Sequence, residues 1–163
     1  MIIEQATIKD IRDVALAMRD SDYDEFLAVS FADGREALAA SLVERFGGRD
    51  DVLAFSDEQG PVAIGALINA RPNVMTLLFF ANDRFALIAG DLARWATREL
   101  FPRQRAAGVH RIEAIARASH ESAKRWIGML GLEPEGPPFR GYGRRGEAYQ
   151  QFAWVSDACS PCA

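Results

Sequence analysis

The stretch that decides the fold is residues 108–136, GVHRIEAIARASHESAKRWIGMLGLEPEG. Residues 110–117 read as a short strand, in which alternation places Ile112 and Glu113 on opposite faces. Residues 119–130 then carry apolar side chains at helical spacing after a polar start. Glycine follows this helix and ends it, as it commonly does at helix C-termini. The segment therefore predicts a strand, a helix and an exit into a further strand.

The rest of the chain predicts more elements of both kinds, because its apolar spacing changes between the strand and the helix period. The expected strands cover 1–6, 51–56, 61–70, 73–80, 110–117, 133–142 and 147–155. The expected helices cover 8–18, 23–27, 33–46, 84–100 and 119–130. Pro102 is expected to limit the fourth of these helices, since proline breaks the helical hydrogen-bond ladder. The last two strands form a closing hairpin. This order predicts the α/β class.

Composition predicts one compact domain. The chain has 163 residues, of which 49% are apolar and 26% are charged, enough to bury one full core. We expect the domain to cover 1–155 and a C-terminal tail to cover 156–163. The tail contains Cys159 and Cys162, which make only half of a zinc site. We therefore expect no metal site and interpret these cysteines as free thiols of a frayed tail; the alternative is adventitious metal binding or disulfide chemistry.

Charge and hydropathy exclude several functional classes. The formal net charge is −4, whereas a nucleic-acid-binding protein normally has a basic face. No run of eighteen apolar residues exists, so we expect no membrane span. The first residues lack the basic and apolar regions of a secretion signal. We therefore expect a cytoplasmic protein with neither nucleic acid nor membrane as partner.

Several short motifs resemble one enzyme family. They are R-I-E-A at 111–114, the spacing from His120 to Ala123 and on to G-L at 131–132, and E-G at 135–136. Together they resemble the C-terminal half of the GCN5-related N-acetyltransferases (GNAT), nearest the branch that acetylates ribosomal-protein N-termini. The resemblance implies a single domain with a mixed, mostly antiparallel sheet splayed between its fourth and fifth strands, with flanking helices. It also implies acetyl-CoA as cosubstrate, lying in the splay.

The resemblance also implies a set of cofactor-binding residues. The strand that ends at Phe80 would pair with the pantetheine arm, and the loop after it would hold the pyrophosphate at a helix start. Arg84 falls at the first position of the family's loop motif, with Leu87 where glycine is expected. The alternative is an ordinary turn with a solvated arginine, and His120 as no more than the polar start of a helix. The implied residues are Leu78, Phe79, Phe80, Arg84, Ala89, Gly90, His120 and Ala123.

For catalysis, Glu113 is the expected general base, with a pKa raised by an apolar cleft. The alternative for Glu113 is a salt bridge to Arg111 or Arg117. Tyr142 and Tyr149, on the closing hairpin, are alternatives to Glu113 as the base. The resemblance also implies a tyrosine as general acid to the departing thiolate, but Ile127 stands at that position. An acidic cluster could attract a cationic amine, or it could be a solvated helix junction. Its members are Asp20, Asp22, Asp24 and Glu25.

These features predict acetyl transfer from acetyl-CoA to a primary amine of a small molecule or peptide. Two alternatives stay open. One is a non-catalytic protein of this fold, which the departures at Leu87, His120 and Ile127 favour; short divergent chains of this kind also resemble acetyltransferase-like proteins of bacteriophages and prophages. The other is a module that binds acyl-CoA only as a ligand. The closing hairpin is a common pairing surface in the family, so a homodimer is an expected assembly.

Overall fold

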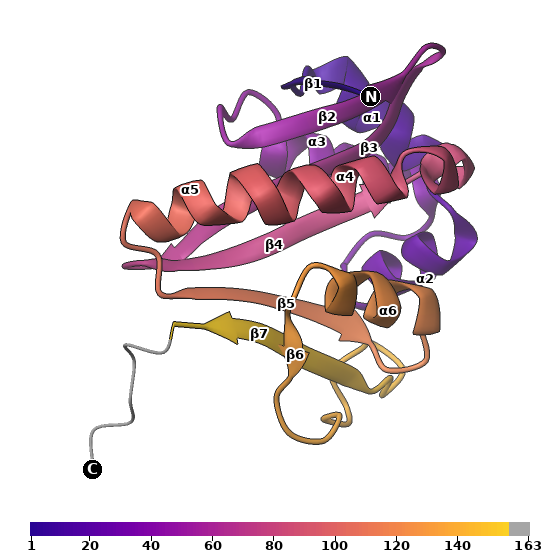
Figure 1. Ribbon diagram of the computed structural model, residues 1–163. Helices are drawn as coiled ribbons and strands as arrows, with labels where there is room; N and C mark the ends of the chain where they lie inside the picture. Colours follow the sequence, from indigo (N-terminus) through magenta and orange to yellow (C-terminus); the bar gives the residue numbers. More distant parts are fainter. Residues whose placement is uncertain (157–163) are drawn as a thin grey trace.

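A mixed sheet of seven strands runs through residues 1–156, the part of the chain that the computed structural model describes (Figure 1). The order across the sheet is β1-β2-β3-β4-β5-β7-β6, and only β4 and β5 pair in parallel. The strands are β1 (Ile2–Gln5), β2 (Val52–Asp57), β3 (Gly60–Arg71), β4 (Val74–Ala81), β5 (Arg111–Arg117), β6 (Glu133–Pro134) and β7 (Tyr149–Val155). The predicted α/β fold class is thereby confirmed.

Helices cover both faces of this sheet (Figure 1). One face carries α1 (Ile8–Leu16), α2 (Asp20–Ala28) and α3 (Arg35–Phe46). Thr7 begins α1 with a capping box, in which its side chain accepts from the Asp10 main chain and so satisfies a free N–H of the first turn. The other face carries α6 (Glu121–Met129) and a long helical segment after β4. Each face thus has its own hydrophobic core.

The helical segment after β4 passes through Pro102 instead of ending there. It runs through η1 (Asp83–Leu87), α4 (Ala89–Trp95), η2 (Ala96–Leu100) and α5 (Phe101–Ala106). The wider π-helical turn of η2 lets the Phe101 N–H bond to the Ala96 carbonyl. Pro102 follows directly in α5, and the wider turn before it gives room to the proline ring, which in a regular α-helix would clash with the carbonyl four residues earlier. The predicted helix end at this proline is therefore wrong.

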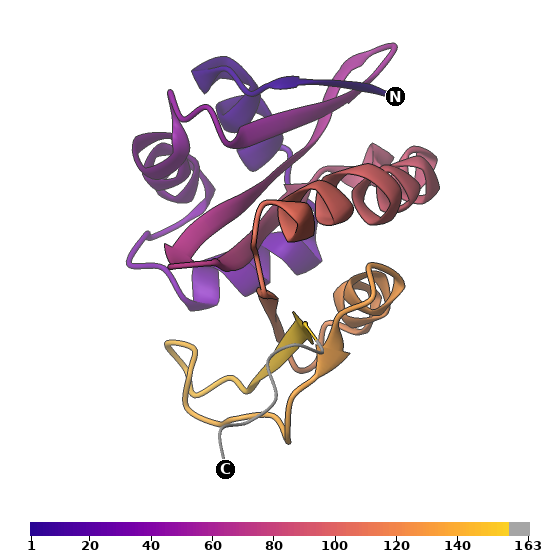
Figure 2. The same ribbon diagram turned by 60° about the vertical axis from the view of Figure 1, so that its left-hand side comes forward.

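The predicted splay between the fourth and fifth strands is confirmed. β4 and β5 pair over three positions, from Val74 with Arg111 to Thr76 with Glu113, and then diverge (Figure 2). Main-chain groups point to alternate sides along a strand. The Ala81 N–H donates to the Asp22 carboxylate on α2, and the Ala81 carbonyl accepts from the Arg19 N–H just before α2. Both main-chain groups of Ala81 therefore point away from β3. The same parity turns the main chain of residues 77 and 79 into the gap.

The predicted closing hairpin is wrong in its first strand. β6 spans only Glu133–Pro134, because Gly136 and Gly141 have φ angles of 70° and 72° and the prolines at 137–138 lack a main-chain donor. The loop that follows returns to α2, where the Arg144 N–H donates to the Ala28 carbonyl at 2.7 Å. This loop therefore closes one side of the gap.

Two further expectations concern the ends of the fold. Residues 157–163, with Cys159 and Cys162, lie outside the described residues, so the expected tail and its boundary stay a prediction. Within 1–156, no helix combines the length and the apolar character that crossing a membrane requires.

Candidate functional site

A cavity of about 200 Å³ lies where β4 and β5 diverge. Its walls come from α2, β4, β5, α6 and the loop before β7. Most of its lining is apolar or aromatic. The polar members are few and convergent, which is the usual character of a small-ligand site. They include Arg19, Asp22, Glu25, His120, Tyr142 and Tyr149.

The centre of the polar lining is His120, which directly precedes α6 and is 8% exposed. Its Nδ1 lies 2.5 Å from Glu25 Oε2, and its Nε2 lies 3.7 Å from Asp22 Oδ1. An ionised carboxylate can only accept a hydrogen bond. The contact with Glu25 therefore assigns the imidazole proton to Nδ1, and in the neutral ring Nε2 carries the free lone pair.

Asp22 is held independently of the imidazole. Its carboxylate accepts from the Arg19 guanidinium at 2.6 and 2.9 Å and from the Ala81 N–H at 3.0 Å. The Arg19 guanidinium in turn lies over the Phe85 ring, 4.9 Å from the ring centroid. These contacts fix α2 against the end of β4. Two carboxylates thus lie beside His120: Asp22, which also bonds to a guanidinium, and Glu25, which bonds to the imidazole.

Two buried side-chain atoms lack a hydrogen-bond partner among residues 1–156. They are Nε2 of His120 and Nε1 of Trp126, and both residues line the same cavity. Buried polar atoms are nearly always paired, and leaving one unpaired costs about 1–3 kcal/mol. The cavity thus offers one nitrogen lone pair and one N–H donor to a molecule that would occupy it.

Three aromatic rings bridge the gap on the face that carries α4 and α6. The Phe79 ring on β4 lies 4.4 Å from the Trp126 ring on α6, measured between centroids. Phe85 contacts both of them, at 5.0 and 5.5 Å. Nothing can pass between Phe79 and Trp126 at this separation. A ligand entering from this face therefore has to move the Trp126 ring.

The two candidate tyrosines differ in their surroundings. The Tyr149 hydroxyl donates to the Glu25 carbonyl at 2.7 Å, and burial, followed by the charge of Glu25, raises the pKa of Tyr149. Tyr142 packs against it at 4.9 Å between ring centroids and is 51% exposed. Both line the cavity, but Tyr149 is held by the main chain whereas Tyr142 lies at the rim.

Glu113 lies at the closed end of the gap and is not part of the cavity lining. Its carboxylate accepts from Arg111 at 2.7 Å, from Arg71 at 2.9 Å and from Thr76 at 3.3 Å. Burial raises the pKa of Glu113, but hydrogen bonds and charge from Arg111 and Arg71 outweigh burial and hold this pKa below its usual value. The expected raised pKa is therefore wrong, and the alternative, a salt bridge to Arg111, is confirmed.

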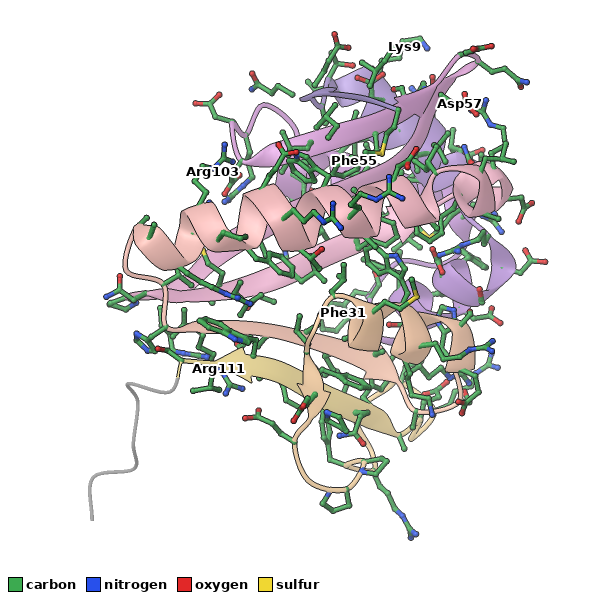
Figure 3. The ribbon with its side chains drawn as sticks, in the orientation of Figure 1. Lys9, Phe31, Phe55, Asp57, Arg103 and Arg111 are labelled. Atoms are coloured by element: carbon green, nitrogen blue, oxygen red, sulfur yellow. The ribbon has the colours of Figure 1, made fainter. Side chains whose placement is uncertain are left out.

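Arg84 points away from the gap. Its guanidinium bonds to Asp57 at 2.8 Å and to the Pro61 carbonyl at 3.0 Å, which ties it to the turn between β2 and β3. Figure 3 shows Asp57 at that turn, at the upper right, while Arg111 marks the far, closed end of the gap. A local carboxylate and carbonyl thus engage the guanidinium, and the role of Arg84 at the cofactor phosphates stays a prediction.

The remaining cofactor-binding expectations divide by the face of the sheet. Leu78, Phe79 and Ala123 line the cavity. Phe80 packs in the core beneath α1 and α3, with no exposed surface. Ala89, which begins α4, and Gly90 after it lie outside the cavity lining. Sequence reasoning missed the pairing of His120 with Glu25, because 95 residues separate them; the acidic cluster was the only signal.

The sequence matches no protein-family model, and no curated protein matches it significantly. Solved structures do match. A ribosomal-protein-alanine N-acetyltransferase from Brucella melitensis is 20% identical, with a TM-score of 0.65, over 95% of this chain and 99% of that one. The ribosomal-protein-S18-alanine N-acetyltransferase of Escherichia coli is 17% identical, with a TM-score of 0.66, over 99% and 98%.

A third similar structure is a GNAT-superfamily phosphinothricin acetyltransferase from Sinorhizobium meliloti in complex with acetyl-CoA. It is 18% identical, with a TM-score of 0.68, over 99% of this chain and 92% of that one. At these identities the likeness establishes the fold. This chain has the fold of the GNAT acetyltransferases, as the motifs around 108–136 implied.

Proposed function

We propose that this protein transfers an acetyl group from acetyl-CoA to a primary amine of a small molecule or peptide. The fold supports the reaction class, since the similar structures include acetyltransferases and one acetyl-CoA complex. Acyl transfer from a thioester needs mainly positioning and a proton acceptor. Both requirements can be met by residues at the open end of the gap.

The observation that carries the proposal is the coincidence of unpaired atoms at one cavity. His120 Nε2 and Trp126 Nε1 both lack partners among residues 1–156 and belong to its lining. The main chain of residues 77 and 79 faces the same gap. An extended arm with amide groups fits there, because it can pair with this edge as a strand pairs with its neighbour. Leu77 and Phe79 would hold the arm.

The acceptor side of the cavity suits an amine. Asp22 and Glu25 place negative charge beside aromatic rings, among them Phe26 and Tyr149. Carboxylates and ring faces both attract an ammonium group. We infer that the amine enters from the side of α2 and the arm from the side of α4 and α6.

The phosphate end of acetyl-CoA receives less support from the side chains. Arg84 is held by Asp57, and Leu87 replaces the expected glycine with a side chain that is 74% exposed. Main-chain N–H groups at the start of α4, near Ala89, are the donors that remain for phosphates. When bound, acetyl-CoA would supply the activated acyl group, and the chain would position it.

The direct test is turnover with a panel of amines. Purified protein is mixed with acetyl-CoA and benzylamine, tyramine or a peptide that begins with alanine, and release of the CoA thiol is followed together with the mass of the product. We expect an acetylated amine with at least one member. Equal thiol release with and without every amine would contradict amine acetylation.

One observation favours a second candidate function without catalysis. The protein would then either bind acyl-CoA only as a ligand or have lost acyl-CoA binding altogether. The contact between Phe79 and Trp126 closes the gap on the face from which the arm would enter. Acetyl-CoA binding without any acetylated product would favour the binding module. Absence of both would favour the non-catalytic alternative.

A further inference from the structure

We propose that His120, oriented by Glu25, is the group that takes the proton from the attacking amine, in place of Glu113. This inference rests on the proposed acetyl transfer. The imidazole lies in the cavity lining, 8% exposed, with Nε2 unpaired. Glu113 lies at the closed end, bonded to two arginines. Among residues 1–156, His120 thus combines a place in the cavity lining with a buried nitrogen that has no hydrogen-bond partner.

The two carboxylates beside His120 orient its ring for this role. Glu25 holds Nδ1–H at 2.5 Å, so Nε2 is the atom that gains and loses the proton. Asp22 Oδ1, at 3.7 Å from Nε2, would stabilise the imidazolium formed after proton transfer. This is the arrangement in which a carboxylate fixes a histidine tautomer and supports its positive charge.

The other charged and titratable groups around the imidazole are already engaged. Arg19 bonds to Asp22, and Arg117 lies 3.9 Å from Glu147. Tyr149 donates its proton to the Glu25 carbonyl, and burial raises its pKa. Tyr142 lies at the rim. The charged and titratable groups that line the cavity with His120 are Arg19, Asp22, Glu25, Tyr142 and Tyr149, and the Arg117 carbonyl accepts from the His120 N–H.

The reaction balances with this assignment. Nε2 takes one proton from the ammonium, and the freed amine lone pair attacks the thioester carbonyl carbon. A C–N bond forms and the C–S bond breaks, so the sulfur leaves with the bonding electrons. The second amine proton goes to the CoA sulfur, which gives the thiol. His120 then releases its proton to solvent, and the products are the amide, free CoA and one proton.

The test compares three substitutions, with the best amine from the panel. His120→Gln keeps an amide that can donate to Glu25 but cannot act as a base. His120→Asn also keeps an amide able to contact a cofactor arm. His110→Gln is the matched control, because His110, the only other histidine of the chain, precedes β5 at the closed end. We expect kcat to fall about 10²–10⁴-fold in both His120 variants, with the KM for acetyl-CoA within a few-fold, and no change in the control.

The pH dependence separates chemistry from folding. In the parent, kcat should rise with pH as the catalytic base loses its proton, and both His120 variants should lose this rise. Glu25→Gln keeps His120 and tests orientation: the rise should move along the pH axis and kcat should fall. Folding is checked by thermal unfolding of each variant.

The possible outcomes are distinct. Normal turnover and an unchanged pH profile in a folded His120→Gln or His120→Asn would overturn the assignment of His120 while acetyl transfer stands. An unshifted profile in Glu25→Gln would overturn the orienting role. A parent that acetylates no amine would overturn the proposed function, and the assignment of His120 with it.

Discussion

Both ends of the gap between β4 and β5 contain buried or partly buried carboxylates, but the two ends differ in how completely their polar groups are paired. At the closed end, Glu113 accepts hydrogen bonds from Arg111 and Arg71, and these more than offset the effect of burial on the pKa of Glu113. At the open end, Asp22 is paired, but Glu25 contacts only one nitrogen of His120, whose other nitrogen has no partner among residues 1–156. The closed end is electrostatically complete and the open end is not.

This difference separates structural carboxylates from functional ones. A carboxylate saturated by guanidinium groups has a low pKa and is a poor proton acceptor. A buried imidazole with one free nitrogen keeps the capacity to bind and to accept a proton. Substitutions of Asp22, Trp126 and Glu113 each change one end of the gap and leave the other end as the reference.

The largest effect is expected for Asp22→Asn. The carboxylate holds Arg19 and the Ala81 N–H, and the side chain is 5% exposed. Removing one member of a buried pair leaves the other uncompensated, so we expect a loss of about 3 kcal/mol in the free energy of unfolding. Urea unfolding measures the loss as a lower midpoint at unchanged slope. Asp20→Asn is the control, since that side chain is 98% exposed; an equal loss there would contradict the pairing.

For Trp126→Ala we expect a smaller loss in the free energy of unfolding, about 2 kcal/mol. The ring is only partly buried, and removing a fully buried aromatic ring would cost more. The substitution also removes the unpaired Nε1–H that the cavity offers to a ligand, so acetyl-CoA should bind several-fold more weakly by calorimetry. Trp154→Ala is the control; Trp154 packs under the Arg105 guanidinium at 3.8 Å. Tighter acetyl-CoA binding in Trp126→Ala would show that the ring, which contacts Phe79 across the gap, is a barrier and not a ligand contact.

For Glu113→Gln we expect about 1 kcal/mol of destabilisation at neutral pH, because its ion pairs are partly exposed. The folded pKa of Glu113 is lowered, so its contribution is present above the unfolded value of 4.5 and is lost as the pH falls below it. Parent and variant should therefore converge in stability in acid. Turnover should stay within a few-fold. A drop of a hundredfold would restore Glu113 as the base.

The smallest effect is expected for Arg84→Ala. Its bonds to Asp57 and the Pro61 carbonyl tie down a turn, so stability should fall by less than about 1 kcal/mol. Acetyl-CoA affinity should stay within twofold by calorimetry. A tenfold weaker affinity would mean that the guanidinium leaves Asp57 to meet the phosphates.

The sequence predicted the fold more completely than the site, and particular residues show why. The run 110–117 alternates and the strand through Phe80 is almost wholly apolar, so both strands could be predicted from local sequence, whereas the splay between them was implied by the family resemblance. The helix end at Pro102 was wrong, because a π-helical turn before it depends on packing and not on local propensity. Two glycines and two prolines could have indicated that 133–142 is mostly loop.

The site depends on contacts between distant segments, which periodicity does not encode. Leu78, Phe79, His120 and Ala123 do line one cavity, together with Tyr142. The contact of His120 with Glu25 joins α2 to α6 across the gap, and Arg84 turned to Asp57 because a carboxylate was nearby. The motif positions thus predicted several residues of the cavity lining. They did not predict which partner each charged side chain contacts, and that partner determines what the side chain can do.

The most direct measurement is a thermal shift with acetyl-CoA on the parent and on Ala123→Phe, whose ring would fill the cavity from α6. At a hundred times the dissociation constant, ligand binding stabilises the parent by about 2.7 kcal/mol, which raises Tm by roughly 2–4 °C. We predict this shift for the parent and its loss in Ala123→Phe. No shift in the parent at millimolar acetyl-CoA, or equal shifts in both proteins, would contradict an acetyl-CoA site at the open end of the gap.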